Sequence, residues 1–388
     1  KMEIPSLRSF IVDLISRADE VTDLYAYALT AFGSKNKVPM AIKRGCGDAM
    51  NKFDAYQLAK YNRDNSVKFK DILKITHVKP VDVAHAKAFK EILDDKLAPA
   101  DTWETLLSTE GQKHKAEQRS KADLWTEMVT RTGSGSMGYM ALLRNLRNIQ
   151  DAFAGGAPVV NTQMAEQLKA FKGFSGVEKN ASMIDVVAAR LTNEHDILKS
   201  KQLPMAFVKA YESIGDSRLK GAVEKAADIA LGNLPILGER VVVILDVSGS
   251  MTGQPVETGA IFASALYKAN AGEGRKCDVI LFSDNAARVK DITQNMSVMK
   301  IRDKIVRSIY GGGTNIESAF KVMEKLSYEP DVVIVISDME VNPIGGSRYS
   351  FGLGVHENVA KDALKIAINM SGSQTTPMPD RAGWHQLS

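Results

Sequence analysis

Hydrophobic residues recur at helical spacing through the first part of the chain, as in Leu7, Phe10, Ile11 and Leu14. No segment before residue 240 has the pattern of a strand, and the helical stretches are joined by short polar connections. Helices are predicted within 7–32, 38–62, 68–77, 82–94, 101–109, 120–130, 137–152, 161–171, 183–192, 204–213 and 217–231. This series predicts an all-α, solenoid-like array of paired antiparallel helices, without a sequence repeat of fixed period.

The pattern changes after residue 240. Short runs rich in β-branched residues, at 241–245, 277–282 and 332–336, are typical of strands buried on both faces of a parallel sheet. Amphipathic helices are predicted between them, at 256–270, 298–309 and 316–326. The alternation predicts a doubly wound, Rossmann-like α/β domain. Clear apolar strands are missing near the C-terminus, where 358–370 is predicted to be helical.

The length of 388 residues exceeds one typical core, so we expect a multidomain α and α/β protein. The predicted division is a helical domain at 1–237 and an α/β domain at 238–388, least regular after about residue 345. The apolar runs are too short to span a membrane. Cys46 and Cys277 fall in different domains, which excludes a disulfide scaffold. With no signal-peptide pattern, this favours a cytoplasmic protein without membrane association.

Positive charge is concentrated in one stretch of the helical domain. Residues 35–90 carry 13 Lys and Arg against 5 Asp and Glu, a difference of +8, whereas residues 238–388 carry 16 against 17. An excess of this density is typical of a polyanion-binding surface. The alternative is a solvated helical face beside an acidic neighbour, and charge alone does not decide between them.

Oxygen-bearing side chains gather at two predicted strand ends and one glycine-rich loop. Asp246, Ser248 and Ser250 follow the first strand, Thr314 follows a run of three glycines, and Asp338 ends the third strand. The carboxyl ends of parallel strands meet at one rim of the sheet, where α/β folds place their sites. Oxygen ligands of this kind suit a hard divalent cation. The alternative is that these residues only cap buried strands and helices.

The set of five residues resembles the metal-ion-dependent adhesion site of a von Willebrand factor A domain, over about residues 238–340. The resemblance implies Mg²⁺ or Mn²⁺ held by Asp246, Ser248, Ser250, Thr314 and Asp338, partly through water. It also implies an open coordination position for the carboxylate of a partner, such as an acidic protein ligand or an exoribonuclease.

A second resemblance covers the helical domain. The segments are "LAKYNRDNSVKFKDILKITHVKP" (58–80), "GYMALLRNLRNI" (138–149), "ILKSKQLPMAFVKAY" (197–211) and "GNLPILGERVVVILDVSGSM" (232–251). In this order they resemble segments of the TROVE module of Ro autoantigen proteins and their bacterial and phage relatives. The resemblance implies a ring of HEAT-like helical pairs closed by the A domain. It also implies binding of small non-coding, Y-like RNA and of single-stranded ends of misfolded RNA, in RNA quality control or ribonucleoprotein assembly.

Candidate RNA-binding residues follow from this second resemblance and from the basic stretch. Lys60 and His77 match a Lys and a His that contact RNA in the family, whereas Asp64 stands where relatives carry Arg. A packing role below Pro80 is the alternative for His77. The complete candidate set is Lys43, Arg44, Lys60, Arg63, Lys70, His77, Arg144 and Arg147.

Two other functions are open from the sequence. In the first, the chain is a metal-dependent protein-binding module whose helical half is only a scaffold. RNA binding that falls steeply with salt would argue against it. In the second, Asp246 and Asp338 serve a metal-dependent hydrolase. Two-metal chemistry needs more carboxylates than this motif provides, so we expect a protein that is not an enzyme.

Overall fold

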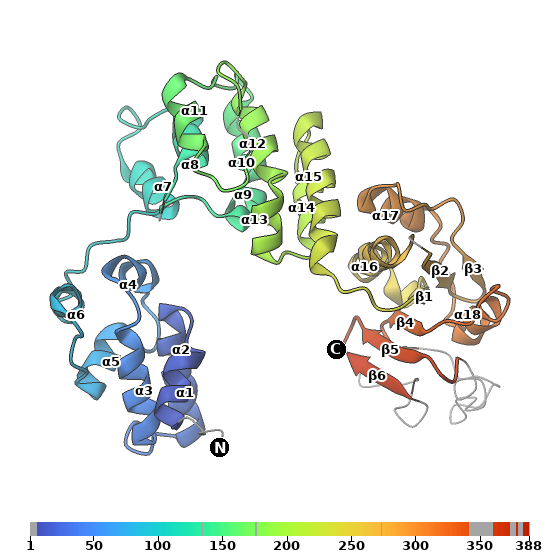
Figure 1. Cartoon of the computed structure of the whole chain (residues 1–388), viewed down its shortest axis with the longest axis horizontal. Helices are drawn as coiled ribbons and strands as arrows, with labels where there is room; N and C mark the ends of the chain where they lie inside the picture. Colours follow the sequence, from blue (N-terminus) through green and yellow to red (C-terminus); the bar gives the residue numbers. More distant parts are fainter. Residues whose placement is uncertain are drawn as a thin grey trace. The chain divides into compact units, whose positions relative to one another are not determined.

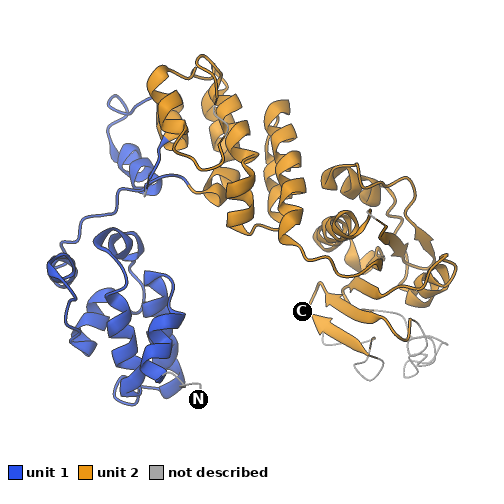
Figure 2. Ribbon diagram, viewed as in Figure 1, with its two compact units in different colours: residues 1–120, 131–137 blue, residues 121–130, 138–388 orange. Residues whose placement is uncertain are grey.

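The structure is a computed structural model that describes residues 6–133, 135–174, 177–272, 274–340, 360–372, 378 and 383–387. The chain forms two compact units (Figures 1 and 2). The first comprises Lys1–Ser120 and Arg131–Met137, and the second comprises Lys121–Thr130 and Gly138–Ser388. The predicted boundary at 237/238 separates two kinds of fold inside the second unit, and it stays a prediction. None of the described helices is both long and apolar enough to cross a membrane.

The first unit is built from helices, with bounds α1 Leu7–Leu14, α2 Ala18–Phe32, α3 Met40–Met50, α4 Ala55–Tyr61, α5 Phe69–Thr76, α6 Val83–Leu93 and α7 Trp103–Gln112. Glycines allow α3 to approach both α1 and α5. A Cβ on Gly45 would lie 2.9 Å from the Cβ of Ile11, and one on Gly47 would lie 2.7 Å from the Cβ of Thr76. These approaches close the apolar core of the unit, which includes Tyr25.

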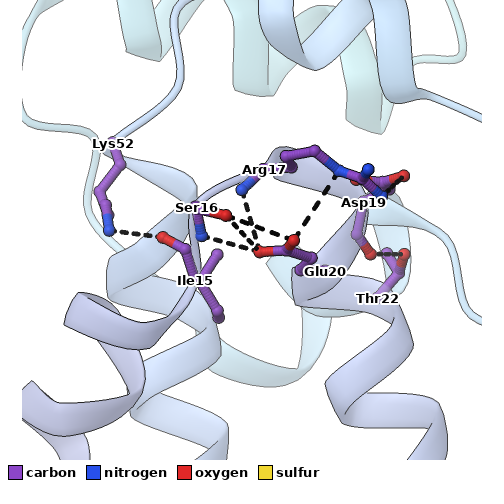
Figure 3. A network of polar contacts seen from close by, with 7 residues as sticks. All are labelled: Ile15, Ser16, Arg17, Asp19, Glu20, Thr22 and Lys52. Carbon is purple, nitrogen blue, oxygen red and sulfur yellow. Dashed lines mark hydrogen bonds and ion pairs between the residues drawn. The ribbon is translucent and has the colours of Figure 1, made fainter. Parts of the chain in front are cut away.

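A polar network fixes the turn between α1 and α2 (Figure 3). The Glu20 carboxylate accepts hydrogen bonds from the backbone N–H groups of Ser16 at 2.7 Å and Arg17 at 3.0 Å. From beyond the end of α3, the Lys52 ammonium donates to the carbonyl of Ile15. A cation at a helix C-terminus satisfies carbonyls that lack an intrahelical partner. One lysine of the basic stretch therefore has a structural role.

The second unit begins with helices α8 Lys121–Thr130, α9 Tyr139–Arg144, α10 Leu146–Phe153, α11 Thr162–Leu168, α12 Met183–Leu191, α13 Glu194–Ser200, α14 Met205–Ser213 and α15 Ser217–Ala230. The single helix predicted at 137–152 is broken at Asn145, whose side-chain amide donates to the carbonyl of Ala141 at 2.8 Å. Such a side-chain bond competes with the regular helical ladder. Helix α13 is absent from the sequence prediction, because its segment carries too little apolar periodicity.

Ion pairs and capping bonds join these helices to the α/β part of the same unit. Asp228 of α15 accepts from the ammonium of Lys268 at 2.8 Å and from the backbone N–H of Val298 at 2.8 Å. The guanidinium of Arg302 pairs with Glu212 of α14 at 3.0 Å. These contacts explain why the α/β part and α14–α15 belong to one compact unit.

The α/β part is a six-stranded sheet in the order β3-β2-β1-β4-β5-β6. Its elements are β1 Arg240–Asp246, α16 Gln254–Asn270, β2 Lys276–Phe282, β3 Ala286–Arg288, α17 Val298–Arg307, α18 Ile316–Met323, β4 Val332–Ser337, β5 Leu364–Asn369 and β6 Trp384–Leu387. All neighbouring pairs are parallel except β2 and β3. Alternate residues of β1 enter two cores, Val243 with the α16 and α17 side and Ile244 with the α18 side. The predicted doubly wound sheet is confirmed.

The C-terminal helix prediction is wrong. Within the stretch 358–370, residues 358 and 359 lie outside the described residues, and 364–369 form β5, which pairs in parallel with β4. Ile366 packs against one core and Ala367 against the other, so the strand is covered on both sides. The expectation that finishing strands are missing is also wrong, because β6 follows. Pairing with a buried neighbour overrides the weak local preference of a short segment interrupted by Lys365.

Candidate metal centre and basic surfaces

Asp246, the last residue of β1, has a buried carboxylate that is fixed on both oxygens. Its Oδ1 accepts from the backbone N–H of Ser248 at 2.8 Å, and its Oδ2 accepts from the hydroxyl of Ser337 at 2.6 Å. Ser337 ends β4, the strand beside β1. The sheet therefore orients the first predicted ligand before any cation binds.

Asp338 supplies a second buried carboxylate at the same rim. It follows β4, and its Oδ1 accepts from the backbone N–H of Glu340 at 3.0 Å. Burial raises the pKa of Asp246, and the nearby charge of Asp338 raises this pKa further. Among the described residues, no ion pair with a cationic side chain is recorded for either carboxylate. Two buried, neighbouring negative charges without a countercharge favour the binding of a cation.

The three hydroxyl candidates lie on loops that the same rim brings together. The Oγ atoms of Ser248 and Ser250 are 3.2 Å apart, and Thr314 is buried. The backbone N–H of Gly249 donates to the carbonyl of Gly312 at 2.9 Å, which ties the serine loop to the threonine loop.

The donor set fits a hard divalent cation. It consists of two carboxylates and three hydroxyls, and Mg²⁺ takes oxygen ligands with water completing its shell. Within the described ranges, no group of three or more His, Cys, Asp or Glu side chains is placed to hold a metal. The candidate site is consistent with this finding, because it has only two carboxylates and takes its other oxygen atoms from hydroxyls.

The basic candidates of the first unit fall into two pockets. The first has a volume of about 300 Å³ and is lined by Arg44, His77 and Lys79, together with Arg8 and its ion-pair partner Asp48. His77 ends α5 in the left-handed region, with φ 49°, and its side chain is exposed. The predicted residues Arg44 and His77 are thus brought together, and this exposure argues against the packing alternative for His77.

The second pocket has a volume of about 360 Å³ and lies between α4 and the segment 97–105. Its cationic residues are Lys60 and Arg63, and its lining also includes one acidic residue, Glu104. The Lys60 ammonium lies 5.7 Å from the centre of the Tyr61 ring. The structure therefore also brings together Lys60 and Arg63.

Some cations of the basic stretch are paired with acidic side chains, which leaves them less able to bind an anionic ligand. Lys70 forms an ion pair with Asp95, and Lys68 forms one with Asp64, the residue that stands in place of the family's Arg. Lys43 is half-buried on α3. Acidic neighbours thus neutralise part of the charge excess, whereas the described structure records no ion pair for the cations of the second pocket.

Arg144 and Arg147 lie in the second unit and are exposed on either side of the break at Asn145. Together with Lys209 of α14, they line a groove of about 410 Å³. Lys209 is not among the residues predicted from the sequence, although it lies within the segment 197–211 that resembles the TROVE module. Nothing local distinguishes it from other exposed lysines, because the two arginines that line the groove with it are distant in sequence.

Comparison with known proteins defines the class first. Residues 241–340 match the family model of the von Willebrand factor type A domain, so the chain joins a helical array to such a domain. The whole chain is similar in structure to the Ro (RSR) protein of Deinococcus radiodurans. The TM-score is 0.63 and the sequence identity 17%, over 98% of this chain and 79% of that one. Both resemblances seen in the sequence are confirmed, the one to Ro proteins at the level of the fold.

Proposed function

We propose that this protein is a Ro-like RNA-binding protein. It binds small non-coding RNA through the basic pockets of its first unit, captures single-stranded ends of misfolded RNA, and acts in RNA quality control or ribonucleoprotein assembly. The observation that carries this proposal is the pairing of exposed basic side chains, Lys60 with Arg63 and Arg44 with His77, on a fold shared with a Ro protein.

The chemistry of the pockets supports RNA as the ligand. Lys60 and Arg63 are exposed and line one pocket, and such cationic side chains bind phosphate oxygens. The cations of this pocket release counterions from RNA when they bind, which makes affinity depend on salt.

The adhesion-type site supports a second, separate activity. Asp246 and Asp338, with the three hydroxyls, would hold Mg²⁺ or Mn²⁺. The bound ion would supply an open coordination position for a carboxylate of a partner protein, an acidic ligand or an exoribonuclease. The site offers hydroxyls rather than bases for proton transfer, which supports binding rather than hydrolysis.

The pocket of Lys60 and Arg63 provides the test for RNA binding. The double variant Lys60→Gln/Arg63→Gln should weaken binding to two unrelated structured RNAs to a similar extent, because phosphate contacts carry no base information. The slope of log affinity against log salt should fall by about 0.7 to 0.9 for each phosphate that the variant no longer binds. The matched control Lys87→Gln/Lys90→Gln removes the same charge from α6 of the same unit.

Equilibrium titrations at several KCl concentrations measure both quantities, and circular dichroism checks the fold. A pocket variant with the affinity and salt slope of the control contradicts the proposal. It would favour the alternative function, a metal-dependent protein-binding module whose helical half is a scaffold. The buried carboxylate pair is the observation that favours this alternative.

A further inference from the structure

We infer that the groove between α9–α10 and α14 binds one nucleotide of an RNA single strand. In this arrangement the phosphate lies between Arg144 and Lys209, and the base lies on the apolar floor. The inference rests on the proposed function and goes further, because it assigns single-stranded RNA to a particular set of side chains in the second unit.

The floor of the groove is apolar and open because α14 presents small side chains to it. Ala206 and Ala210, one helical turn apart, face a wall that includes Met140 and Leu143. Leu143 and Ala210 are buried, whereas Met140 and Ala206 are partly accessible. A larger residue at the more accessible alanine would occupy the space that the groove leaves for a ligand.

Cations stand on both sides of this floor. Arg144 ends α9 and Arg147 lies in the first turn of α10, while Lys209 lies on α14 opposite them. No acidic side chain is among the residues that line the groove. Arg147 is 3.9 Å from Asp151 in an exposed pair, and the described structure records no ion pair for Arg144 or Lys209. The groove therefore has a net positive charge of three from its lining side chains.

Size and chemistry together select the occupant. A volume of about 410 Å³ lies in the range of small-ligand sites and is too small for a helix of a partner protein. An apolar surface between cations suits a planar base joined to an anionic backbone, and arginine planes also stack on bases. A base inside a duplex is already stacked and paired, so only an unpaired nucleotide can use the floor. An acidic peptide would use the cations and leave the apolar floor unoccupied.

Two variants of the full-length chain separate the floor from the charges. Ala206→Leu fills the floor and leaves every cation in place, and leucine is nearly as good a helix former as alanine. Arg144→Gln/Lys209→Gln removes two cations and leaves the floor unchanged. The control Lys225→Gln/Arg307→Gln removes the same two charge types from exposed positions on α15 and α17 of the same unit.

The probes are fluorescent decauridylate, decaadenylate, a ten-base-pair RNA duplex and decaglutamate, titrated at several salt concentrations. Ala206→Leu should lower the affinity for both single strands by roughly tenfold, at an unchanged salt slope. Arg144→Gln/Lys209→Gln should lower affinity and reduce the slope by about 0.7, which corresponds to the one single-strand phosphate that lies between these two cations. The control variant should match the wild type, and neither groove variant should change duplex binding by more than about twofold.

Three results would overturn the inference. If the wild type binds the single strands and Arg144→Gln/Lys209→Gln behaves like the control, the groove is not the site, and the proposed function stands. If decaglutamate binds the groove as tightly as the single strands do, the groove selects negative charge and not a base, so the inference fails while the proposed function stands. If the wild type binds neither single-stranded nor structured RNA, the groove and the proposed function fail together. Because the two cations lie at the surface of the groove, this variant keeps the test decisive even if Ala206→Leu fails to fold.

Discussion

Replacing Asp338 by Asn should remove the Mg²⁺-dependent stability of the second unit without reducing its metal-free stability. The amide keeps the Oδ1 atom that accepts from Glu340, and it has nearly the shape of the carboxylate. What it removes is one of two buried negative charges. The charge of Asp338 adds to burial in raising the pKa of Asp246, which shows that the two carboxylates repel each other. Without metal, the variant should therefore be at least as stable as the wild type.

With Mg²⁺ bound, the wild type should be more stable than Asp338→Asn. A ligand that binds only the folded state stabilises it by about 2.7 kcal/mol at a concentration one hundred times its Kd. For folding units of roughly 150 to 250 residues, each kcal/mol moves the Tm by about 2 to 4 °C. The wild type should then gain roughly 5 to 10 °C between EDTA and saturating Mg²⁺, and Asp338→Asn should gain almost nothing.

Scanning calorimetry suits the measurement, because two compact units are expected to give separable transitions. The matched control is Asp362→Asn, which removes an exposed carboxylate just before β5, at the opposite end of the strands. It should keep the full response to Mg²⁺. The reasoning is refuted if Asp338→Asn responds as the wild type does, or if it is clearly less stable than the wild type in EDTA.

Three further predictions concern packing, acid stability and RNA contacts. Gly259→Ala should cost about 1 to 3 kcal/mol in denaturant unfolding, because its Cβ would lie 2.6 Å from the Cδ1 of Leu245. The control Gly221→Ala, with open space on α15, should stabilise by roughly 0.5 to 1 kcal/mol. The backbone N–H of Arg119, more than any other group, lowers the pKa of Glu110 from 4.5 to about 2. The ionised Glu110 therefore stabilises the fold above pH 4.5, and this stability should be lost as pH falls toward 2. Hydrogen exchange of the segment 110–119 should detect the loss, and Glu110→Gln should abolish its pH dependence. His77→Ala should weaken RNA binding modestly in the same salt titrations, because it removes one exposed side chain from the pocket and leaves Arg44 and Lys79 in place.

The central strands and the position of two carboxylates at one rim of the sheet could be predicted, because both depend on local sequence. The runs at 241–245, 277–282 and 332–336 are rich in apolar, β-branched residues, so they are suited to a position covered on both faces. Once these strands are placed in a parallel sheet, Asp246 and Asp338 must lie at the same rim. The hydrogen bond from Ser337 to Asp246 then follows from the pairing of β1 with β4, whereas Asp338 accepts from the backbone N–H of Glu340 in its own segment.

The features that were not predicted share a dependence on particular partners. The strand β5 exists because β4 pairs with it, and its six residues alone do not distinguish a strand from a helix. Asn145 breaks a stretch whose apolar periodicity is continuous, through a bond of its own side chain. The ion pair of Lys70 with Asp95 spans 25 residues, so nothing in the local sequence distinguishes Lys70 from Lys60.

The difference between local sequence and distant partners also explains why the candidate metal centre is easier to predict from the sequence than the basic surfaces are. Four of the five candidate ligands of the metal centre lie within a few residues of strand ends, and Thr314 lies in the loop before α18. Their spacing along the chain therefore carries most of the geometry. A basic surface is made of long side chains on separate helices, and each cation matters only through its neighbours.

The groove beside α14 shows this dependence directly. Arg144 and Lys209 lie on different helices, far apart in the sequence, and only the fold gives them a common apolar floor and leaves acidic residues out of its lining. A cation on an open surface holds a phosphate only through a screened charge interaction, whereas a cation beside the floor acts on a phosphate that the stacked base holds in place. Neutralising a cation on an open surface should therefore change RNA affinity little. Neutralising a cation that lines a pocket or groove should reduce RNA affinity by an amount that depends on what the neighbouring side chains bind.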